Sequence, residues 1–282
     1  YRHTGDGNYV EKMDFGYDNG LRIIFEDHTN TKWITSEVHG IFKLAPRRKI
    51  KQINSDSLTA PNGIELDTDG NLIIVTANAE IYTWKVKEQS LRREFGSVFT
   101  GDDDYKDRGV IERPIIVPDK QGVLWVAQDN FIARVDRKSG DVTPLAFPKE
   151  DSNYRQFGEF RALALDGKGN VWIGTYKHGV YVYDRETGDF THLSTSDGLS
   201  HPEIHAIFKD SKGNMWVGTG SGVNLWSSEN RSFVQFESDT HQKAGLLGSI
   251  VEDIHETSEG QIWVATQRGL NLYKPETKTF DW

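Results

Sequence analysis

The sequence of 282 residues contains no cysteine. This absence excludes disulfides, iron–sulfur clusters, thiolate zinc sites and cysteine nucleophiles, and it leaves the cellular compartment open because many periplasmic proteins also lack cysteine. No apolar run approaches the roughly 18 residues of a membrane-spanning helix. The chain begins at Tyr1 without a methionine or a signal sequence, and we expect it to be a mature product or an excised piece of a longer protein.

Positive charge is also scarce, with 33 Lys and Arg residues against 42 Asp and Glu residues and a formal net charge of -9. Because nucleic-acid affinity depends largely on clustered Lys and Arg, the sequence predicts no nucleic-acid partner. A chain of this length buries about three quarters of its unfolded surface, so it can hold a core without a metal or a disulfide. We expect no cofactor.

Three segments of the chain are nearly the same. They read "GNVWIGTYKHGVYVYDRETGDF" from Gly169, "GNMWVGTGSGVNLWSSENRSF" from Gly213 and "GQIWVATQRGLNLYKPETKTF" from Gly260. The tryptophan of the Gly-x-x-Trp pattern recurs with spacings of 47, 44 and 47 residues at Trp125, Trp172, Trp216 and Trp263. Two degenerate units, anchored at Trp33 and Ile73, precede them. Internal repeats of this period indicate a repeat architecture.

Each unit contains four short segments of alternating apolar and polar residues, which predict β-strands. In the fourth unit we expect strands at 161–166, 171–175, 179–184 and 190–193. Four strands per unit, joined by Gly and Asp turns, are typical of a β-propeller blade. The recurrent residues have structural roles in this reading, because the Asp of each turn can cap backbone N–H groups, the Gly three positions later can adopt positive φ, and the tryptophan can fill the wedge between sheets.

The sequence therefore predicts an all-β fold, a β-propeller of four-stranded antiparallel blades that forms a single domain over residues 1–282. Six blades are expected, at 21–53, 61–95, 114–147, 160–193, 204–236 and 249–282. Seven blades, or a fragment of a longer propeller array, are the alternatives. The segment 7–15 resembles a lone outer strand that could close the ring with the last blade, although residues 278–282 also resemble an outer strand.

The segment "IFKDSKGNMWVGTGSGVNLW" at 207–226 resembles the two-component regulator propeller repeat. The matching positions are Asp210, Gly213, Asn214, Trp216, Gly218, Thr219 and Gly222 in the fifth unit, and Asp166, Gly169, Asn170, Trp172, Gly174, Thr175 and Gly179 in the fourth. The last unit departs from the pattern, because Glu256 precedes Gly260 by four residues and Ala265 replaces a glycine. The resemblance is strong from Val117 to Trp282 and weak before it.

This resemblance implies a non-catalytic, ligand-sensing domain of a bacterial extracytoplasmic signalling receptor, located in the periplasm or outside the cell. Proteins of this family often respond to oligosaccharides, so a small polar ligand or an oligosaccharide is the expected partner. A homodimer or signalling domains attached outside this chain are further candidate partners. The repeat motif specifies the blade and not the ligand, and fold analogy alone is a weak warrant for function.

In a propeller, the connections from strand D to the next strand A and from B to C emerge on one face. The long and divergent segments of this chain fall on that face, and binding residues concentrate in such loops. Aromatic rings can stack on sugars, and Arg can bind a carboxylate or sulfate with two hydrogen bonds. The predicted ligand-binding residues are Tyr154, Arg155, Arg161, Tyr176, Lys177, His178, His201 and Arg268.

Three alternatives stay open beside this reading. A polysaccharide lyase or glycosidase could use His178 or His205 with Tyr176 for proton transfer. A protein-interaction platform would expose a large apolar patch. A metal could bind His201, Glu203 and His205 of "HPEIH", because strand-like spacing puts all three on one side, although the proline argues against a zinc-binding helix. The leading prediction includes no catalytic and no metal-binding residue, and the acidic run "GDDDYKD" at 101–107 is expected to be a solvated loop.

Overall fold

The computed structural model describes the strands within residues 1–57 and, with their side chains, residues 58, 60–99, 114–128, 131–145, 160–238, 245–257 and 259–282. The chain divides into two compact units, Tyr1–Gly96 and Ser97–Trp282. In the described residues, all regular structure is β apart from one short 3-10 helix, η3 (Thr195–Asp197). The described strands form one two-stranded sheet and six four-stranded sheets.

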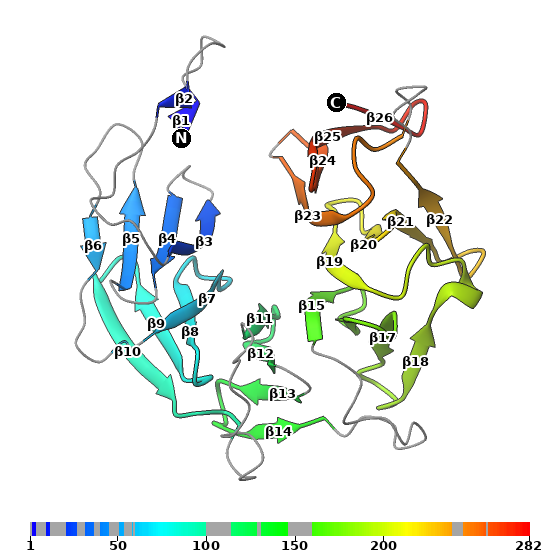
Figure 1. Ribbon diagram of the computed structural model, residues 1–282. Helices are drawn as coiled ribbons and strands as arrows, with labels where there is room; N and C mark the ends of the chain where they lie inside the picture. Colours follow the sequence, from blue (N-terminus) through cyan, green and yellow to red (C-terminus); the bar gives the residue numbers. More distant parts are fainter. Residues whose placement is uncertain are drawn as a thin grey trace. The chain divides into compact units, whose positions relative to one another are not determined.

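The first unit contains the two-stranded sheet and the first and second four-stranded sheets (Figure 1). The two-stranded sheet pairs β1 (Arg2–His3) with β2 (Val10–Glu11). The first sheet contains β3 (Leu21–Glu26), β4 (Lys32–Ser36), β5 (Gly40–Leu44) and β6 (Lys51–Ile53). The second contains β7 (Pro61–Leu66), β8 (Leu72–Thr76), β9 (Ile81–Lys85) and β10 (Ser90–Phe95).

The second unit contains four further sheets. The third has β11 (Ile115–Pro118), β12 (Val123–Gln128), β13 (Phe131–Asp136) and β14 (Val142–Pro144). The fourth has β15 (Phe160–Leu165), β16 (Val171–Thr175), β17 (Val180–Tyr183) and β18 (Phe190–Leu193). The fifth has β19 (Ile204–Lys209), β20 (Met215–Thr219), β21 (Gly222–Ser227) and β22 (Ser232–Phe236). The sixth has β23 (Val251–Glu256), β24 (Ile262–Thr266), β25 (Gly269–Lys274) and β26 (Thr279–Asp281).

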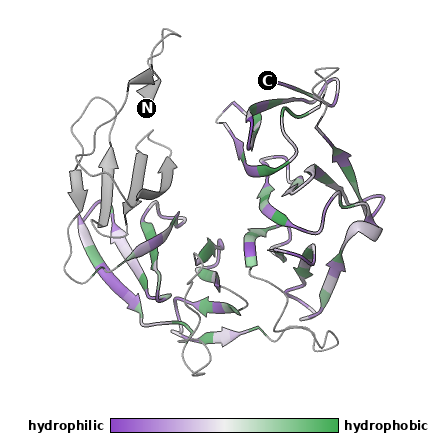
Figure 2. Cartoon of the chain, in the orientation of Figure 1, coloured by the Kyte–Doolittle hydropathy of each residue, from purple (hydrophilic) through white to green (hydrophobic). Residues whose placement is uncertain are grey.

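In every four-stranded sheet the strands pair antiparallel in chain order, and we name them A to D in that order. In the second sheet, strand B is buried along its length, whereas strand D carries charged residues. Figure 2 accordingly colours β8 mainly as hydrophobic and much of β10 as hydrophilic. The fold class predicted from the sequence is confirmed. The four strands expected in the fourth unit are also confirmed, each within one residue of the predicted bounds.

The blade number, the single domain and the ring closure stay predictions. Val10–Glu11, within the segment expected to close the ring, pairs with Arg2–His3. The sixth sheet has its own strand D at Thr279–Asp281.

In the second to fifth sheets one carboxylate organises the A-to-B turn, as predicted. Asp210 Oδ1 accepts hydrogen bonds from the backbone N–H groups of Lys212 and Asn214 at 3.0 and 2.8 Å. Its Oδ2 accepts from Asn214 Nδ2 at 2.8 Å and from Trp216 Nε1 at 3.0 Å, while Gly213 adopts a φ of 87°. The spacing of Asp, Gly, Asn and Trp in the repeat therefore supplies the hydrogen bonds and the backbone conformation of this one turn.

The sixth sheet keeps this turn with a different residue. Thr257, three positions before Gly260, accepts the backbone N–H of Gln261 at its Oγ1 at 3.2 Å. Thr257 therefore occupies the place of the aspartate, so Glu256 is not needed to hold this turn. The Glu256 carboxylate instead accepts hydrogen bonds from Ser211 of the fifth sheet, at 2.6 Å from the backbone N–H and 2.7 Å from Oγ.

The tryptophans of strand B fill the wedges between successive sheets, as predicted. Trp125, Trp172 and Trp216 each meet an aromatic residue from strand C of the next sheet in an edge-to-face arrangement. The ring centroids lie 5.8 Å apart in Trp125–Tyr183, 5.8 Å in Trp172–Trp226 and 4.9 Å in Trp216–Tyr273. The buried hydrophobic clusters of the second unit likewise combine residues of two successive sheets.

The glycine of the Gly-Thr pair in strand B is required by the same packing. A Cβ atom at Gly174 would lie 2.5 Å from Ile204 Cγ2, and one at Gly218 would lie 2.5 Å from Val251 Cγ1. Ile204 and Val251 are the first residues of strand A in the following sheets. Successive sheets of the second unit therefore approach too closely for a side chain at these two positions.

Candidate functional site

The B-to-C connections and the D-to-A crossings leave the sheets at one common end, which we call the loop end. The A-to-B and C-to-D turns lie at the other, which we call the turn end. In the second unit the loop end is described for the fourth, fifth and sixth sheets. Its connections comprise 176–179, 194–203, 220–221, 245–250 and 267–268.

Each B-to-C connection at the loop end is closed by the last residue of strand B, a threonine. The Oγ1 atoms of Thr175, Thr219 and Thr266 donate to the carbonyl oxygens of the glycines that begin the return, at 2.9, 2.9 and 3.0 Å. Thr175 Oγ1 also accepts the backbone N–H of His178 at 2.9 Å. These short connections are therefore held by local bonds, and their intervening side chains do not have to maintain the turn.

The D-to-A crossings are fixed by two buried asparagines in strand C. Asn224 Oδ1 accepts the backbone N–H of Ser200 at 2.9 Å, and Asn271 Oδ1 accepts that of Leu247 at 2.7 Å. Both side chains are fully buried. The sequence analysis missed them, although the repeated Gly-x-Asn-Leu of 222–225 and 269–272 is the signal that could have identified them.

Strand A is interrupted at its loop end in the same way in all three sheets. Phe160 pairs with Thr175 and Ala162 with Gly174, so the pairing skips the residue between them. The skipped residues of the fourth, fifth and sixth sheets are Arg161, His205 and Glu252. A bulge redirects one side chain away from the ladder, and bulges occur often beside binding sites.

The three bulge residues occupy equivalent positions on strands that contact one another, β15 with β19 and β19 with β23. Arg161 and Glu252 are exposed, and His205 is half-buried. The arrangement offers a cation, an imidazole and a carboxylate side by side. The sequence analysis predicted Arg161 alone as a ligand-binding residue. It considered His205 only for catalysis or metal binding, and it missed Glu252, because a bulge leaves no mark in the alternation of apolar residues.

Three of the predicted residues lie together beside the first of these bulges. The Arg161 guanidinium carbon lies 4.9 Å from the centroid of the Tyr176 ring, and Lys177 Nζ lies 5.2 Å from it. Two cations at these distances make cation–π contacts with the tyrosine. His178 follows directly, and its carbonyl oxygen lies 2.6 Å from Nε2 of His192.

His201 belongs to a second group, formed by the crossing into the fifth sheet. Its Nδ1 accepts the backbone N–H of Glu203 at 3.2 Å, and Glu203 Oε1 lies 3.4 Å from His205 Nε2. Gly220 packs against it, since a Cβ there would lie 2.9 Å from His201 Nδ1. The part of the chain that the structure describes contains no group of three His, Cys, Asp or Glu residues able to hold a metal ion.

The remaining predicted residues lie apart or outside the described chain. Arg268 is exposed in the B-to-C connection of the sixth sheet, beyond the fifth sheet from the Tyr176 group. Tyr154, Arg155 and the acidic run at 101–107 lie outside the described residues. Beside the third bulge, burial raises the pKa of Asp253, the residue after Glu252. The described loop end therefore combines Arg161, Tyr176 and Lys177 with His201, His205 and Glu252.

Comparison with protein families finds the two component regulator propeller, matched at residues 156–177 and 198–221. Both segments belong to the fourth and fifth repeat units, where the sequence motif is clearest. A comparison with the curated proteins finds no match. Within the described residues, no helix has the length and apolar composition needed to cross a membrane.

Solved structures of similar fold include extracellular domains of bacterial signalling proteins. The extracellular domain of BT3049 from B. thetaiotaomicron, assigned as a hybrid two component system, is 24% identical with a TM-score of 0.66, over 93% of this chain and 33% of that one. That of BT4673, assigned as a one component system of the same organism, is 16% identical with a TM-score of 0.53, over 96% and 42%. This chain therefore spans less than half the length of either relative.

An enzyme shares the fold as well. Virginiamycin B lyase from Staphylococcus aureus is 16% identical with a TM-score of 0.68, over 93% of this chain and 83% of that one. Identities this low establish the fold alone, and the fold is common to sensor domains and to a lyase. The family match at residues 156–177 and 198–221 and the propeller-type β fold together confirm the resemblance predicted from the sequence.

Proposed function

We propose that this chain is the ligand-sensing part of a bacterial extracytoplasmic receptor and binds a small polar ligand at the loop end without transforming it. The three equivalent bulges that present Arg161, His205 and Glu252 are the observation that carries this proposal. The three residues differ in chemical type at equivalent positions, and the Arg161 and Glu252 side chains are exposed to solvent. The extracytoplasmic location rests on the likeness to extracellular signalling domains.

The ligand chemistry follows from the Tyr176 group. An aromatic ring beside two cations suits an oligosaccharide that carries carboxylate or sulfate groups, because the ring can cover an apolar sugar face while the cations bind the acid. His205 and Glu252 add hydrogen-bond partners for sugar hydroxyls. Signalling further requires that the ligand bind two arrangements of the receptor with different affinity.

The experiment is a thermal-shift screen against neutral, uronic-acid and sulfated oligosaccharides. A ligand that binds the folded state raises its melting temperature by mass action, so an acidic oligosaccharide should give a saturable increase. The double variant Arg161→Gln/Lys177→Gln should lose most of this increase. The control Lys138→Gln/Lys168→Gln, which removes two exposed lysines at the turn end, should retain it. No shift with any oligosaccharide, or an equal shift in the first variant, would overturn the proposal.

A lyase is the second candidate, supported by the shared fold of virginiamycin B lyase. The same ligands distinguish it, because an enzyme would convert the bound oligosaccharide during incubation and a sensor would return it intact. Chromatography of the recovered ligand gives this result directly. Cleavage that disappears in a His205→Gln variant would favour the enzyme.

A further inference from the structure

A cavity of about 380 Å³ opens at the turn end, between the fifth and sixth sheets. Its walls include the A-to-B turn of the fifth sheet and the C-to-D turn of the sixth. The residues on which the argument depends are Asp210, Trp216, Glu256, Tyr273, Lys274 and Pro275. This cavity lies at the opposite end of the sheets from the proposed ligand site.

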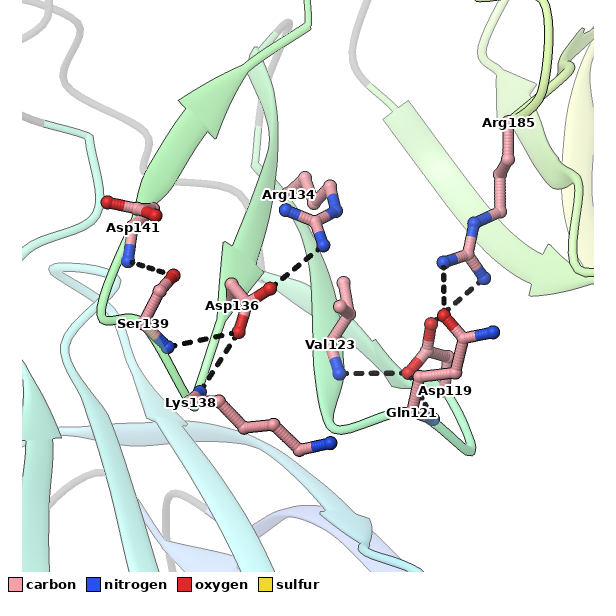
Figure 3. Close-up of polar contacts among 9 residues, drawn as sticks. All are labelled: Asp119, Gln121, Val123, Arg134, Asp136, Lys138, Ser139, Asp141 and Arg185. Atoms are coloured by element: carbon pink, nitrogen blue, oxygen red, sulfur yellow. Dashed lines mark hydrogen bonds and ion pairs between the residues drawn. The ribbon is translucent and has the colours of Figure 1, made fainter.

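The equivalent space between the third and fourth sheets is filled by the chain itself. Arg185, in the C-to-D turn of the fourth sheet, reaches across to the A-to-B turn of the third (Figure 3). Its Nη1 lies 2.9 Å from Asp119 Oδ2, and its Nη2 donates to Gln121 Oε1 at 3.2 Å. The guanidinium also lies 5.8 Å from the centroid of the Trp125 ring.

The repeat identifies the residue that corresponds to Arg185 in the sixth sheet. Tyr183 and Tyr273 are equivalent, because each meets the strand-B tryptophan of the preceding sheet edge to face. Counting two residues onward from each tyrosine gives Arg185 in the fourth sheet and Pro275 in the sixth. Proline cannot extend into the junction, and the cavity occupies the space that a guanidinium fills between the third and fourth sheets.

The two junctions also differ in charge. The junction of the third and fourth sheets pairs one carboxylate, Asp119, with one guanidinium. The cavity is lined by three carboxylates, Asp210, Glu256 and Glu276, of which Asp210 is buried. Asp210 and Glu256 accept hydrogen bonds from neutral groups, and for Asp210 these include Asn214, whose equivalent in the third sheet is Val123. Among the described residues neither of these two carboxylates has an ion-pair partner.

The lysines of the cavity do not replace the missing guanidinium. Lys274 Nζ lies 3.2 Å from Asp281 Oδ2, so its charge is already paired. Lys212 is exposed on a long flexible side chain at the rim. Trp216 and Tyr273 in the wall can cover the flat face of a delocalised cation and its aliphatic stem.

We propose that this cavity binds a guanidinium group on an aliphatic stem, in the position that Arg185 takes between the third and fourth sheets. The group has two sources, an arginine side chain of a polypeptide or a free guanidino compound. Either would place one delocalised cation between two carboxylates and against an aromatic wall. The site is independent of the proposed ligand site at the loop end.

The test is calorimetric titration of the whole chain with N-acetyl-arginine amide. The matched probes are the citrulline and lysine analogues and a pentapeptide, Gly-Gly-Arg-Gly-Gly. We expect citrulline to bind at least about tenfold more weakly, since it keeps the shape and loses the charge. Lysine should also bind more weakly, because an ammonium is a point charge without the planar fork. Tighter binding of the pentapeptide identifies a polypeptide source, and equal binding identifies a free compound.

Two variants test the geometry. Pro275→Arg should supply the guanidinium from the chain itself, abolish binding and leave the melting temperature unchanged or higher. Glu256→Gln keeps a hydrogen-bonding side chain for Ser211 and should weaken binding about fivefold or more. The control Glu259→Gln, an exposed carboxylate outside the cavity, should not. Absence of binding to the unmodified chain, equal binding of citrulline or lysine, or undiminished binding by folded Pro275→Arg would overturn the proposal.

Discussion

Arg185 Nη1 lies 2.9 Å from Asp119 Oδ2, so a guanidinium from the fourth sheet neutralises a carboxylate in the first turn of the third. The Asp119 side chain is 4% exposed. Val123 replaces the asparagine that satisfies this aspartate in the next two sheets. The contact therefore compensates locally for a departure from the repeat. A second pair in the same sheet, Arg134 and Asp136, has the same 2.9 Å separation but is more exposed, 35% and 23%.

We predict that Arg185→Ala lowers the free energy of unfolding by about 2 kcal/mol, because it leaves the Asp119 charge buried without its partner. Arg134→Ala should change it much less, because solvent screens that pair. Urea denaturation of both variants measures the difference. Equal losses would show that burial of the carboxylate does not set the strength of the contact.

We predict that Gly174→Ala destabilises the fold by about 1 to 3 kcal/mol. The added methyl would lie 2.5 Å from Ile204 Cγ2, and overpacking forces neighbouring sheets apart. Gly167→Ala is the matched control, since nothing lies within 4 Å of a Cβ at that position. Melting temperatures of the two variants test this prediction. An unchanged value for Gly174→Ala would contradict the close approach of the fourth and fifth sheets at this position.

We predict that Asn224→Ala releases the crossing into the fifth sheet. The substitution leaves the backbone N–H of Ser200 and the carbonyl of Val217 without their side-chain partner, at a cost of about 2 kcal/mol. Hydrogen exchange at the Ser200 amide should accelerate. Asn230→Ala, in an exposed turn, serves as the control, and unchanged exchange at Ser200 in the first variant would refute the assignment.

We predict that stability decreases as the pH rises from about 4.5 to 7 through one carboxyl group. Burial raises the pKa of Glu65, in β7, from 4.5 to about 7. The folded state thus favours the neutral form, and this contribution is fully present below the unfolded pKa and lost as the pH passes the folded one. It amounts to about 3 kcal/mol. Glu65→Gln should flatten the difference between pH 4 and pH 8, and parallel curves for variant and wild type would contradict the shift.

The sequence predicted the features that recur in the clearest repeat units. The Asp-x-x-Gly-Asn-x-Trp spacing predicted both the turn at Asp210 and the wedge at Trp216, because each residue satisfies a local need that the repeat preserves. The bulges at Arg161, His205 and Glu252 could not be predicted, because they depend on how two strands pair rather than on which residues are apolar.

The candidate site was predictable only in part for a related reason. Arg161, Tyr176 and Lys177 come together because the start of strand A and the end of strand B adjoin in one antiparallel pair, which a strand assignment implies. Arg268 and His201 belong to different sheets, and their separation depends on the stacking of sheets, which the sequence pattern does not specify.

The bulges have a consequence for how the loop end could be altered. The residue at each bulge lies outside the ladder of strand pairing, and Arg161 and Glu252 are exposed to solvent. Three such positions, on three adjoining strands, can therefore be randomised together while the scaffold stays constant. The same framework could then be selected for ligands of opposite charge, because these three residues would set the specificity and the remaining residues would maintain the fold.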